Sequence, residues 1–533
     1  MPAGYAEDLS GNAAPEVKVE FTVMDRQKPA QRTFNAIVDH SLSVDKIEAS
    51  ADMPAQYRYI QDAIDDAPSA SAKPYLIYIK EGYYKDPNKT FNASYGMRYA
   101  DTSAGSTSTE TVQIPGGANE YDKCNLVCVN KPNIHLIGQA VDKVTIAGDR
   151  LDGGCSDRTR VWYHINAGAS MEVTAAATDF FMENVTLVNE AWTVEKMAGP
   201  QALALNMSSD RAVINNCNVR SYQDTYYSAS TYNRQFWNNS TIEGAVDFIY
   251  GSGDVFFEGC TLKIVRQAGG YIVAPNHPAS TRWGYVFNNT KIVSGVTSPS
   301  SDTKVYFGRP WHETPMTVFL HTQSEVTPYD GIWYPTMGGL PKLWAVYDMW
   351  DANGYARSTE SISDYYYTDK ATGNKVSGKA KNFLTDDEAK QYTIENVFSG
   401  DKSSGKTGYW NPQPIVEKTS TPVLSLNGNV ITWNADDYAI CYVVTVNGKA
   451  VSFPTECRFV ANVGDVVSVQ SVNEHGALSD ASESVTVLTT DIKNISANRN
   501  TESDASFSVN GMKLNKPSQH GVYIENGKKV YKK

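Results

Sequence analysis

The chain has 533 residues, with 47 Lys and Arg against 59 Asp and Glu, and its net charge at pH 7 is -12. This charge argues against a nucleic-acid partner and against an anionic membrane surface, because proteins that bind either of them rely on Lys and Arg. No apolar run approaches the roughly eighteen residues of a membrane span, and the N-terminus has no charged region followed by an apolar stretch, so either a signal peptide has been removed or the protein is cytoplasmic.

The first elements of the chain predict a short helix and a buried strand. After an N-terminal extension, 1–44, residues 55–67 place Tyr57, Ile60 and Ile64 on one helical face, and Pro68 ends the pattern. Residues 75–79 form an apolar run rich in Tyr and Ile, which predicts a buried strand. The polar stretch from 85 to about 120 predicts a long surface loop, with disorder as the alternative.

A loosely repeated pattern begins at about residue 130. Five segments share the order apolar, polar, Asn or Gly, small, polar, apolar, and they begin at Met182, Ile214, Trp237, Phe257 and Phe287. Their third positions, 184, 216, 239, 259 and 289, are separated by 32, 23, 20 and 30 residues. Such repeats, with no helical pattern between them, predict a parallel β-solenoid whose coils bend at the Asn or Gly, because both tolerate left-handed backbone angles.

The cysteines and histidines predict neither a disulfide scaffold nor a metal site. The seven cysteines are scattered and odd in number, which leaves one or two bridges open. Cys217 and Cys260 hold the same register of the repeat, so we interpret them as stacked interior residues and not as reactive thiols. The eight histidines lack metal-type spacing, and Cys124 with Cys128 lacks a second pair, so we expect no metal site.

The C-terminal part predicts a second, smaller unit. Pro and Thr accumulate up to residue 422 and predict a linker. Residues 423–488 alternate apolar and polar around Asn427-Gly428 and Asn447-Gly448, which predicts a small β-sandwich where Cys441 and Cys457 could pair. In the remaining tail, 489–533, a polar stretch precedes a predicted hairpin about Asn526-Gly527.

Solenoid spacing brings a chemically competent set of side chains together. Gln201 and Gln223 are 22 residues apart, and Asp224 and Asp247 are 23 apart, which matches the local repeat. Two carboxylates and two amides would therefore share one groove. They could supply a nucleophile, an acid for the leaving group and donors for an oxyanion, as ester hydrolysis requires. The alternative is that they are polar residues on the wet face of the solenoid.

Four sequence blocks resemble, in order and spacing, the signature blocks of pectin methylesterases. They are Gln-Ala-Leu-Ala-Leu at 201–205, Tyr-Gln-Asp-Thr at 222–225, Gly-Ala-Val-Asp-Phe-Ile-Tyr-Gly at 244–251 and Gly-Arg-Pro-Trp at 308–311. The resemblance covers about 45–415. It implies an all-β fold, a right-handed parallel β-helix of the pectin-lyase-like type, followed here by the sandwich and a short C-terminal β segment.

The resemblance also implies roles for individual residues. Asp247 resembles the family nucleophile and Asp224 the general acid and then base, while Gln201 and Gln223 resemble the oxyanion donors and Arg309 the residue that orients the nucleophile. Trp311 is similar to the family's sugar-stacking tryptophan, and Tyr227 with Phe248 is expected to line the same cleft. The implied partner is methyl-esterified homogalacturonan, or pectin, on which a secreted or cell-surface, monomeric enzyme would act without a cofactor.

Two segments depart from the family pattern, and two others resemble different families. The 85–125 region is longer than expected for the family, and residues 251–253 read Gly-Ser-Gly where Gly-Asn is usual. Both departures concern the rim of the cleft. The sandwich at 423–488 looks like a fibronectin-type or immunoglobulin-like module, and the final segment is similar to the sorting tails of type IX secretion cargo.

Other hydrolytic and lyase functions fit the sequence less well than an esterase. A polysaccharide lyase needs calcium-binding acids and a basic proton abstractor, and a polygalacturonase needs an aspartate cluster of inverting geometry. Neither pattern is found, and there is no Gly-x-Ser-x-Gly elbow and no convincing Cys and His partnership for a serine or thiol hydrolase. The alternatives that stay open are the same chemistry on a different ester and a non-catalytic carbohydrate-binding solenoid.

Overall fold

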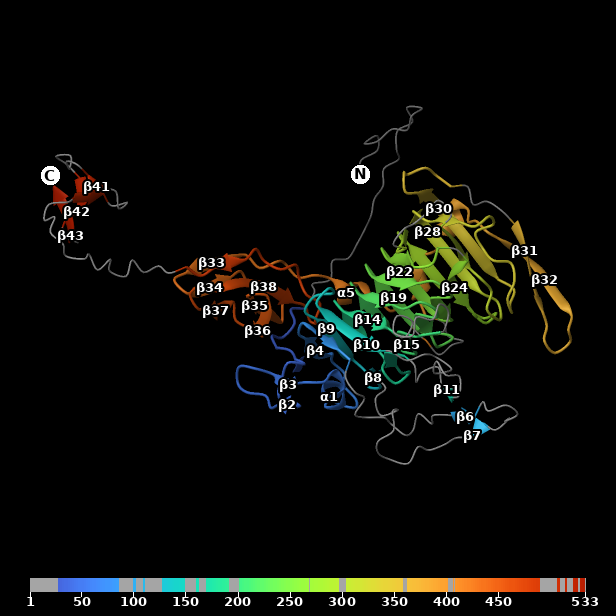
Figure 1. Cartoon of the computed structure of the whole chain (residues 1–533), viewed down its shortest axis with the longest axis horizontal. Helices are drawn as coiled ribbons and strands as arrows, with labels where there is room; N and C mark the ends of the chain where they lie inside the picture. The colour runs from blue at the N-terminus through green and yellow to red at the C-terminus, as the bar shows by residue number, and fades with distance from the viewer. Residues whose placement is uncertain are drawn as a thin grey trace, which may run out of the picture.

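The computed structural model arranges the middle of the chain as one long stack of β-coils (Figure 1). The residues that it describes are 27–85, 99–101, 109–110, 127–148, 160–162, 169–190, 201–267, 269–296, 303–357, 362–400, 406, 408–488, 506–508, 513–514, 521–525 and 528–532. Cys124, Cys155, residues 1–26 and most of the 85–125 region lie outside these ranges.

The stack is the predicted right-handed parallel β-helix, and three parallel sheets run along it. The first sheet comprises β8 (Val127–Val129), β12 (Met171–Val173), β15 (Leu205–Met207), β18 (Tyr226–Ser228), β21 (Ile249–Gly251), β24 (Gly270–Pro275), β27 (Lys304–Gly308) and β29 (Thr327–Pro328). The second comprises β1 (Ala36–Val38), β4 (Tyr75–Ile79), β9 (Ile134–Gly138), β13 (Phe181–Glu183), β16 (Ala212–Asn215), β19 (Arg234–Asn238), β22 (Asp254–Glu258), β25 (Tyr285–Asn288), β28 (Met316–Ser324) and β30 (Leu343–Asp351). The third comprises β5 (Gly82–Tyr84), β10 (Val144–Gly148), β14 (Thr186–Asn189), β17 (Asn218–Arg220), β20 (Thr241–Gly244), β23 (Thr261–Ile264) and β26 (Lys291–Ser294).

The bends between the second and third sheets confirm the role predicted for the repeated Asn or Gly. Asn184, Asn216, Asn239 and Asn289 have φ values of 58, 47, 46 and 51°, and Gly259 has a φ of 60°. The asparagines also join neighbouring coils, since the Asn216 amide donates to Asn184 Oδ1 at 2.6 Å. These five coils therefore turn at residues that accept the left-handed backbone at low cost.

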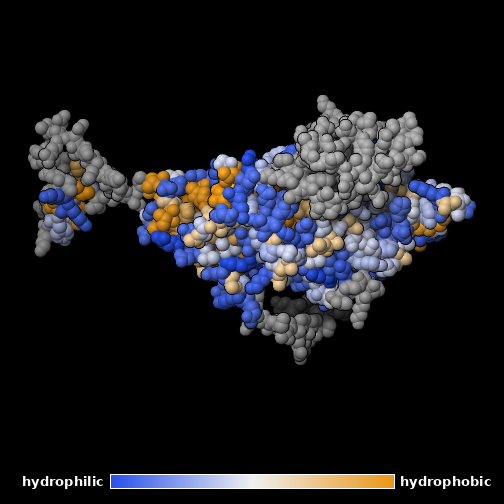
Figure 2. All heavy atoms as spheres, turned by 90° about the horizontal axis from the view of Figure 1, so that it is seen from below, coloured by the Kyte–Doolittle hydropathy of each residue, from blue (hydrophilic) through white to orange (hydrophobic). Residues whose placement is uncertain are grey.

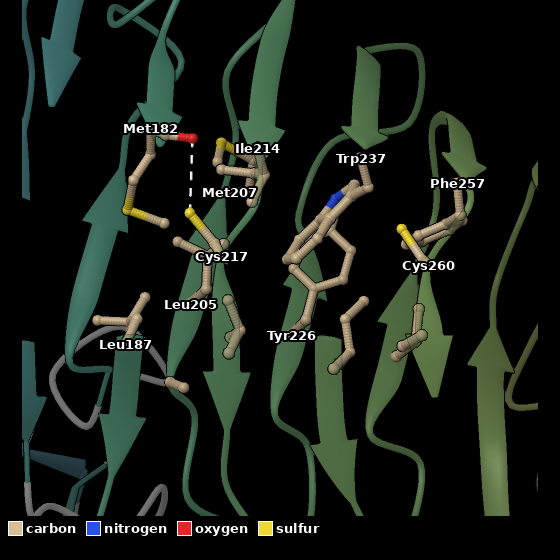
Figure 3. Close-up of a cluster of buried hydrophobic side chains, with 14 of the residues drawn as sticks. Met182, Leu187, Leu205, Met207, Ile214, Cys217, Tyr226, Trp237, Phe257 and Cys260 are labelled. Carbon is tan, nitrogen blue, oxygen red and sulfur yellow. Dashed lines mark hydrogen bonds between the residues drawn. The ribbon is translucent and has the colours of Figure 1, made fainter. Parts of the chain in front are cut away.

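The interior of the stack is apolar and continuous. Cys217 and Cys260 are buried in it beside Trp237 and Phe257, which confirms that they are interior residues (Figure 3). Phe257, Phe287 and Phe319 stack on one another with ring centroids 4.3 Å apart. Rings repeated at the same register thus fill successive coils, which is how parallel stacking turns a sequence repeat into a packed core.

The N-terminal helix is shorter than predicted. The helix is α1 (Ile60–Asp65), and it buries Ile60, Ala63 and Ile64 against the first coils. The residues before it form a strand instead, β3 (Ala55–Tyr57), which pairs with β1 and with β2 (Lys46–Ile47). Tyr57 is drawn into the sheet by its pairing with Val38, so pairing overrides the helical pattern at that end. The strand predicted at 75–79 is confirmed as β4.

The other elements lie outside the three sheets. Three short strands pair antiparallel, β6 (Tyr99–Asp101), β7 (Thr109–Glu110) and β11 (Arg160–Trp162). After the last coil come the hairpin β31 (Ile362–Thr368) and β32 (Lys375–Lys381), and helices α3 (Asp386–Ala389), α4 (Ile394–Val397) and α5 (Gln413–Val416). The chain ends with β40 (Ser506–Ser508), β41 (Lys513–Leu514), β42 (Gly521–Glu525) and β43 (Lys528–Lys532), and the hairpin of β42 and β43 is the one predicted.

Residues 424–486 form two small antiparallel sheets. One consists of β33 (Leu424–Asn427), β34 (Val430–Trp433) and β37 (Arg458–Val460), and the other of β35 (Cys441–Val446), β36 (Lys449–Ser452), β38 (Val466–Val472) and β39 (Val485–Thr486). Both predicted Asn-Gly hairpins are present, at β33–β34 and β35–β36. The predicted disulfide between Cys441 and Cys457 is wrong, because both thiols are free. Cys441 packs in the apolar cluster shared with the solenoid, whereas the Cys457 thiol donates to the Tyr442 hydroxyl at 3.3 Å.

This sandwich is docked on the solenoid. Phe453 of the sandwich packs edge-on against Phe34 and Tyr78 of the first coils, with centroids 5.6 and 5.0 Å away. One apolar cluster contains residues of both units, and Ile415 and Val416 of α5 pack against it, so the predicted linker is part of the contact. The outer surface of the sandwich remains partly apolar, with Val423 and Val463 71% and 58% exposed (Figure 2).

A buried carboxyl marks the same boundary. Glu183 of β13 accepts hydrogen bonds from the Leu478 backbone N at 3.1 Å and from the Asn215 amide at 2.9 Å. Burial raises the pKa of Glu183 from 4.5 to about 8, since these donors compensate only part of the lost hydration. The pKa of Glu183 is higher in the folded protein than in the unfolded chain. The stability that the neutral Glu183 carboxyl contributes is therefore fully present below about pH 4.5 and is lost as the pH rises through about 8.

The variant Glu183→Gln tests this linkage. We expect the melting temperature of the variant to rise steadily relative to that of wild type as the pH increases from 5 to 9. The reason is that Gln cannot acquire the buried charge that Glu183 acquires over this range. Thermal unfolding monitored by circular dichroism measures the difference. Glu258→Gln is the matched control, since Glu258 is bonded by two asparagines of the same ladder away from the sandwich. The same trend in both variants would contradict the linkage to Glu183.

Candidate active site

Strand pairing brings the predicted carboxylates and amides together on the first sheet. Gln201 bridges to Gln223 and Gln223 bridges to Val246, both in parallel, at the points where the chain enters β18 and β21. β18 pairs with β21 so that Tyr226 faces Ile249, and continuing this register by two residues sets Asp224 beside Asp247. Adjacent parallel strands lie about 4.8 Å apart, so the two aspartates occupy neighbouring coils.

Both aspartates occupy a sharp bend. Asp224 has a φ of 60° and Asp247 a φ of 49°, a left-handed conformation that is uncommon for residues other than Gly. The bend before Asp247 is tight, because a Cβ on Gly244 would lie 2.2 Å from Cβ of Phe248 and 2.9 Å from Oγ1 of Thr225. Non-glycine residues held in this conformation cluster at functional sites.

Arg309 forms a two-pronged contact with Asp247. Its Nε donates to Asp247 Oδ1 at 2.7 Å, and its Nη2 donates to Oδ2. The backbone of Arg309 is fixed where β27 ends, since its N–H donates to the Val273 carbonyl at 3.0 Å. The preceding residue must be small, because a Cβ on Gly308 would lie 2.5 Å from Val273 Cγ2. The fork holds the carboxylate plane in one orientation.

The electrostatics of the pair are set by burial and by the fork. Asp247 is only 5% exposed, and burial raises the pKa of its carboxyl above 3.8 although Arg309 opposes the change. Burial disfavours the charge on Arg309, yet its bond to Asp247 raises the pKa of the guanidinium. Asp224, Gln223 and Gln201 are more accessible than Asp247. A buried anion held by one cation thus lies beside a second carboxyl and two amides, a set suited to nucleophilic acyl transfer.

An aromatic surface lies on the same sheet. Tyr227 and Tyr250 stack with centroids 4.5 Å apart and planes 13° apart, and Trp311 meets Tyr250 edge-on at 5.6 Å. These rings rest on Ala169, Leu203 and Ala274. Tyr227 and Trp311 keep part of their surface exposed, so they are available to a ligand.

Phe248 does not belong to this surface. Its side chain has no exposed area and packs in the interior of the solenoid with Ile249 and Tyr226. The prediction that Phe248 lines the cleft is therefore wrong. The reason is the left-handed bend at Asp247, after which the chain directs both Phe248 and Ile249 into the interior.

Sequence reasoning missed two residues near the aspartates. Tyr250 follows Asp247 by the same three positions that separate Tyr227 from Asp224, so the repeat contained the signal that would have found it. Tyr271 lies one coil after Asp247, and its ring packs on the guanidinium of Arg309 with Cζ 4.2 Å from the centroid. Applying the coil spacing once more, from 247 to 271, would have identified it.

The described residues contain neither a membrane-spanning helix nor a metal-type cluster. None of the helices within the ranges given above is long and apolar enough to cross a membrane. Over the same ranges, no group of three or more His, Cys, Asp or Glu side chains has the arrangement of a metal site.

Comparisons with known proteins agree on one family. The family described as Pectinesterase matches residues 99–401. A pectinesterase of Petunia integrifolia is 25% identical over 364 residues, which cover 66% of this chain and 80% of the relative. Pectinesterase 1 of Solanum lycopersicum is 26% identical over 373 residues, covering 67% of this chain but 55% of the relative, so the chain spans about half the length of such longer relatives. A solved pectin methylesterase from Erwinia chrysanthemi is 22% identical, with a TM-score of 0.46, over 69% of this chain and 97% of that one.

The placement of Phe248 can be tested by stability. We expect Phe248→Ala to lower the free energy of unfolding by about 3 to 5 kcal/mol, because it empties a filled interior site. Tyr227→Ala, the matched control on the outer face of the same sheet, should cost less than half as much. Urea denaturation followed by tryptophan fluorescence measures both, and equal costs would contradict the assignment of the two rings to opposite faces.

Proposed function

Since this chain belongs to the pectinesterase family, we propose that it hydrolyses the methyl esters of galacturonate in pectin and releases methanol. The observation that carries the proposal is the Arg309 fork on the buried Asp247. A buried carboxylate held in this way is oriented for attack. Arg211 forms a similar fork on Asp179, but the Asp179 side chain is 32% exposed, against 8% for Asp247.

The first half of the proposed reaction forms an acyl-enzyme. Asp247 attacks the C6 carbonyl of a methylated galacturonate, and the amides of Gln201 and Gln223 donate to the oxygen that becomes negative. Asp224 gives its proton to the departing methoxide, which leaves as methanol. The C6 carbon is now bonded to a carboxyl oxygen of Asp247, and Asp224 is ionised.

The second half returns the enzyme to its starting state. Asp224 takes a proton from water, and the resulting hydroxide attacks the same carbonyl carbon. The bond to Asp247 breaks, so the product leaves as galacturonic acid, which then loses its proton to solvent, and Asp247 is a carboxylate again while Asp224 keeps its proton. One water is consumed for each methanol and each carboxylic acid formed, and no cofactor takes part.

The surroundings of the site fit a neutral stretch of polysaccharide. Tyr227 and Trp311 offer rings to sugar faces, with Tyr250 beneath them. The net charge of -12 favours esterified stretches over freed carboxylates. We further propose that residues 45–415 carry the reaction, with extension 1–44, sandwich 423–488 and tail 489–533 as appendages. The protein would act as a monomer, secreted or at the cell surface, where this polymer lies.

Methanol release from highly methylated pectin tests the proposal. We expect Asp247→Asn and Asp224→Asn to lower kcat by about a thousandfold or more, because each isosteric change removes an ionisable group used in both half-reactions. Circular dichroism should report folded protein in each case. Asp364→Asn is the matched control, as Asp364 pairs with Lys379 on an exposed hairpin. A folded wild type that releases no methanol would sink the assignment and favour another ester or a binding role.

The pH dependence of kcat/KM provides a second test. The nucleophile must be ionised, so activity is lost as the pH falls through the pKa of Asp247, and burial puts this acid limb above 3.8. We expect Arg309→Met to move the limb to still higher pH, because the charge that opposes protonation is removed. Arg282→Met, which removes an arginine that packs on Trp283, is the control. If Arg309→Met leaves the acid limb of kcat/KM at the same pH as in wild type, the limb belongs to a group other than Asp247.

A further inference from the structure

Arg309 has a second partner besides Asp247. The face of its guanidinium lies against the ring of Tyr271, with Cζ 4.2 Å from the centroid. A cation over an aromatic face is attracted by the ring's quadrupole, and the attraction is greatest where both are shielded from water. The Arg309 side chain is 21% exposed. The arginine is therefore clamped between a carboxylate at its edge and a ring at its face.

Tyr271 is itself held by a column of rings. It pairs with Tyr306 across β24 and β27, and their rings stack at 5.6 Å with planes 14° apart. Tyr306 stacks in turn on Tyr329 at 4.2 Å, and the Tyr329 hydroxyl accepts a hydrogen bond from the Gly269 N–H at 2.8 Å. Tyr334 closes the column edge-on, 5.4 Å from Tyr271 and 5.2 Å from Tyr306.

The column is aligned with the carboxylates. β21 pairs with β24 so that Ile249 faces Val273, and continuing this register backward sets Asp247 beside Tyr271. The faces of Tyr306 are taken up by its neighbours, so the column is not arranged as a platform for a sugar. Its arrangement suits the support of Arg309.

We propose that Tyr271 is a positioning residue, which holds the Arg309 guanidinium in the plane of the Asp247 carboxylate. This inference rests on the proposed function and deepens it. In the acyl-enzyme the Asp247 oxygens carry no net charge, so the ion pair with Arg309 is lost for part of each turnover. The ring of Tyr271 remains, and it keeps the arginine from swinging away before Asp247 is released as a carboxylate.

Asp247 has titratable groups around it on its own and the neighbouring coils. They include Arg309, Asp224 of the neighbouring coil and Tyr271 itself. Burial raises the pKa of the Tyr271 phenol, so this phenol stays neutral in the pH range of the assay. A change in the acid limb of the pH profile on substitution of Tyr271 would therefore be transmitted through Arg309.

Tyr271→Leu and Tyr271→Phe separate the ring from the hydroxyl. We expect Tyr271→Leu to lower kcat for methanol release about tenfold, in line with the strength of a shielded cation–π contact, with KM within about twofold. Its acid limb should move to higher pH, because a loosened Arg309 opposes protonation of Asp247 less well. Tyr271→Phe keeps the ring and should match wild type in kcat and in pH profile.

Two further variants complete the experiment. Tyr366→Leu removes a tyrosine that packs on Lys375 at 4.0 Å in the β31–β32 hairpin, and as the matched control it should leave kcat and the acid limb unchanged. Tyr306→Leu withdraws the support behind Tyr271 and should lower kcat by a few fold with the same shift of the limb. If Tyr271→Leu does not fold, the test uses Tyr306→Leu and Tyr271→Phe. A lowered kcat and a shifted acid limb in Tyr306→Leu, with wild-type behaviour in Tyr271→Phe, support the positioning role, and any other result overturns it.

The outcomes distinguish this inference from the function on which it rests. Wild-type protein that releases no methanol would overturn both. Active wild type with an unchanged Tyr271→Leu, or with Tyr271→Phe as impaired as Tyr271→Leu, would overturn the positioning role alone. A folded Tyr271→Leu that loses activity with an unmoved acid limb would also overturn it, because a merely structural loss does not act through Asp247.

Discussion

The structure depends on the parallel, in-register stacking of its coils. Each described coil presents the same backbone edge to the next, so the length of a coil decides which side chains become neighbours. A step of twenty to thirty residues along the chain becomes one strand spacing in space. The core of stacked rings from Phe257 to Phe319 and the row of asparagines at the bends follow from this constraint, and so does the meeting of Asp224 with Asp247.

The site adds a local feature to that scaffold. At the entry to β18 and β21 the chain takes a left-handed bend at an aspartate, whereas several bends between the second and third sheets use asparagine. Both residues tolerate this conformation because a short polar side chain can bond locally. The solenoid can therefore carry an aspartate in place of an asparagine at a bend without a change in the path of the chain. Arg309 reaches Asp247 from the end of β27, and the carboxylate that it holds is 8% exposed, whereas Asp179, which Arg211 holds in a similar fork, is 32% exposed.

Sequence reasoning found the features that depend on the repeat and missed those that depend on local backbone geometry and on contacts between distant segments. The period revealed the solenoid, the bends and the positions of the two aspartates, since these depend on spacing alone. Phe248 was misassigned because its direction depends on the left-handed bend at Asp247, which the period does not contain. The Cys441–Cys457 pair failed because Cys441 turns toward the solenoid, a contact that no pattern within the sandwich encodes. The coil spacing leads from Asp247 to the position of Tyr271, but the contact of Tyr271 with Arg309 joins different coils, and spacing alone does not encode it.

The docking of the sandwich has a consequence for how this protein can change over generations. Because Phe453 fills a place beside Phe34 and Tyr78, the solenoid and the sandwich share one interior and are not two independent modules joined in series. A recombination event that replaced the sandwich with an unrelated domain would leave that interior open to water. The two units should therefore be inherited together, with substitutions on one side of the boundary compensated on the other, while the outward loops of both diverge freely.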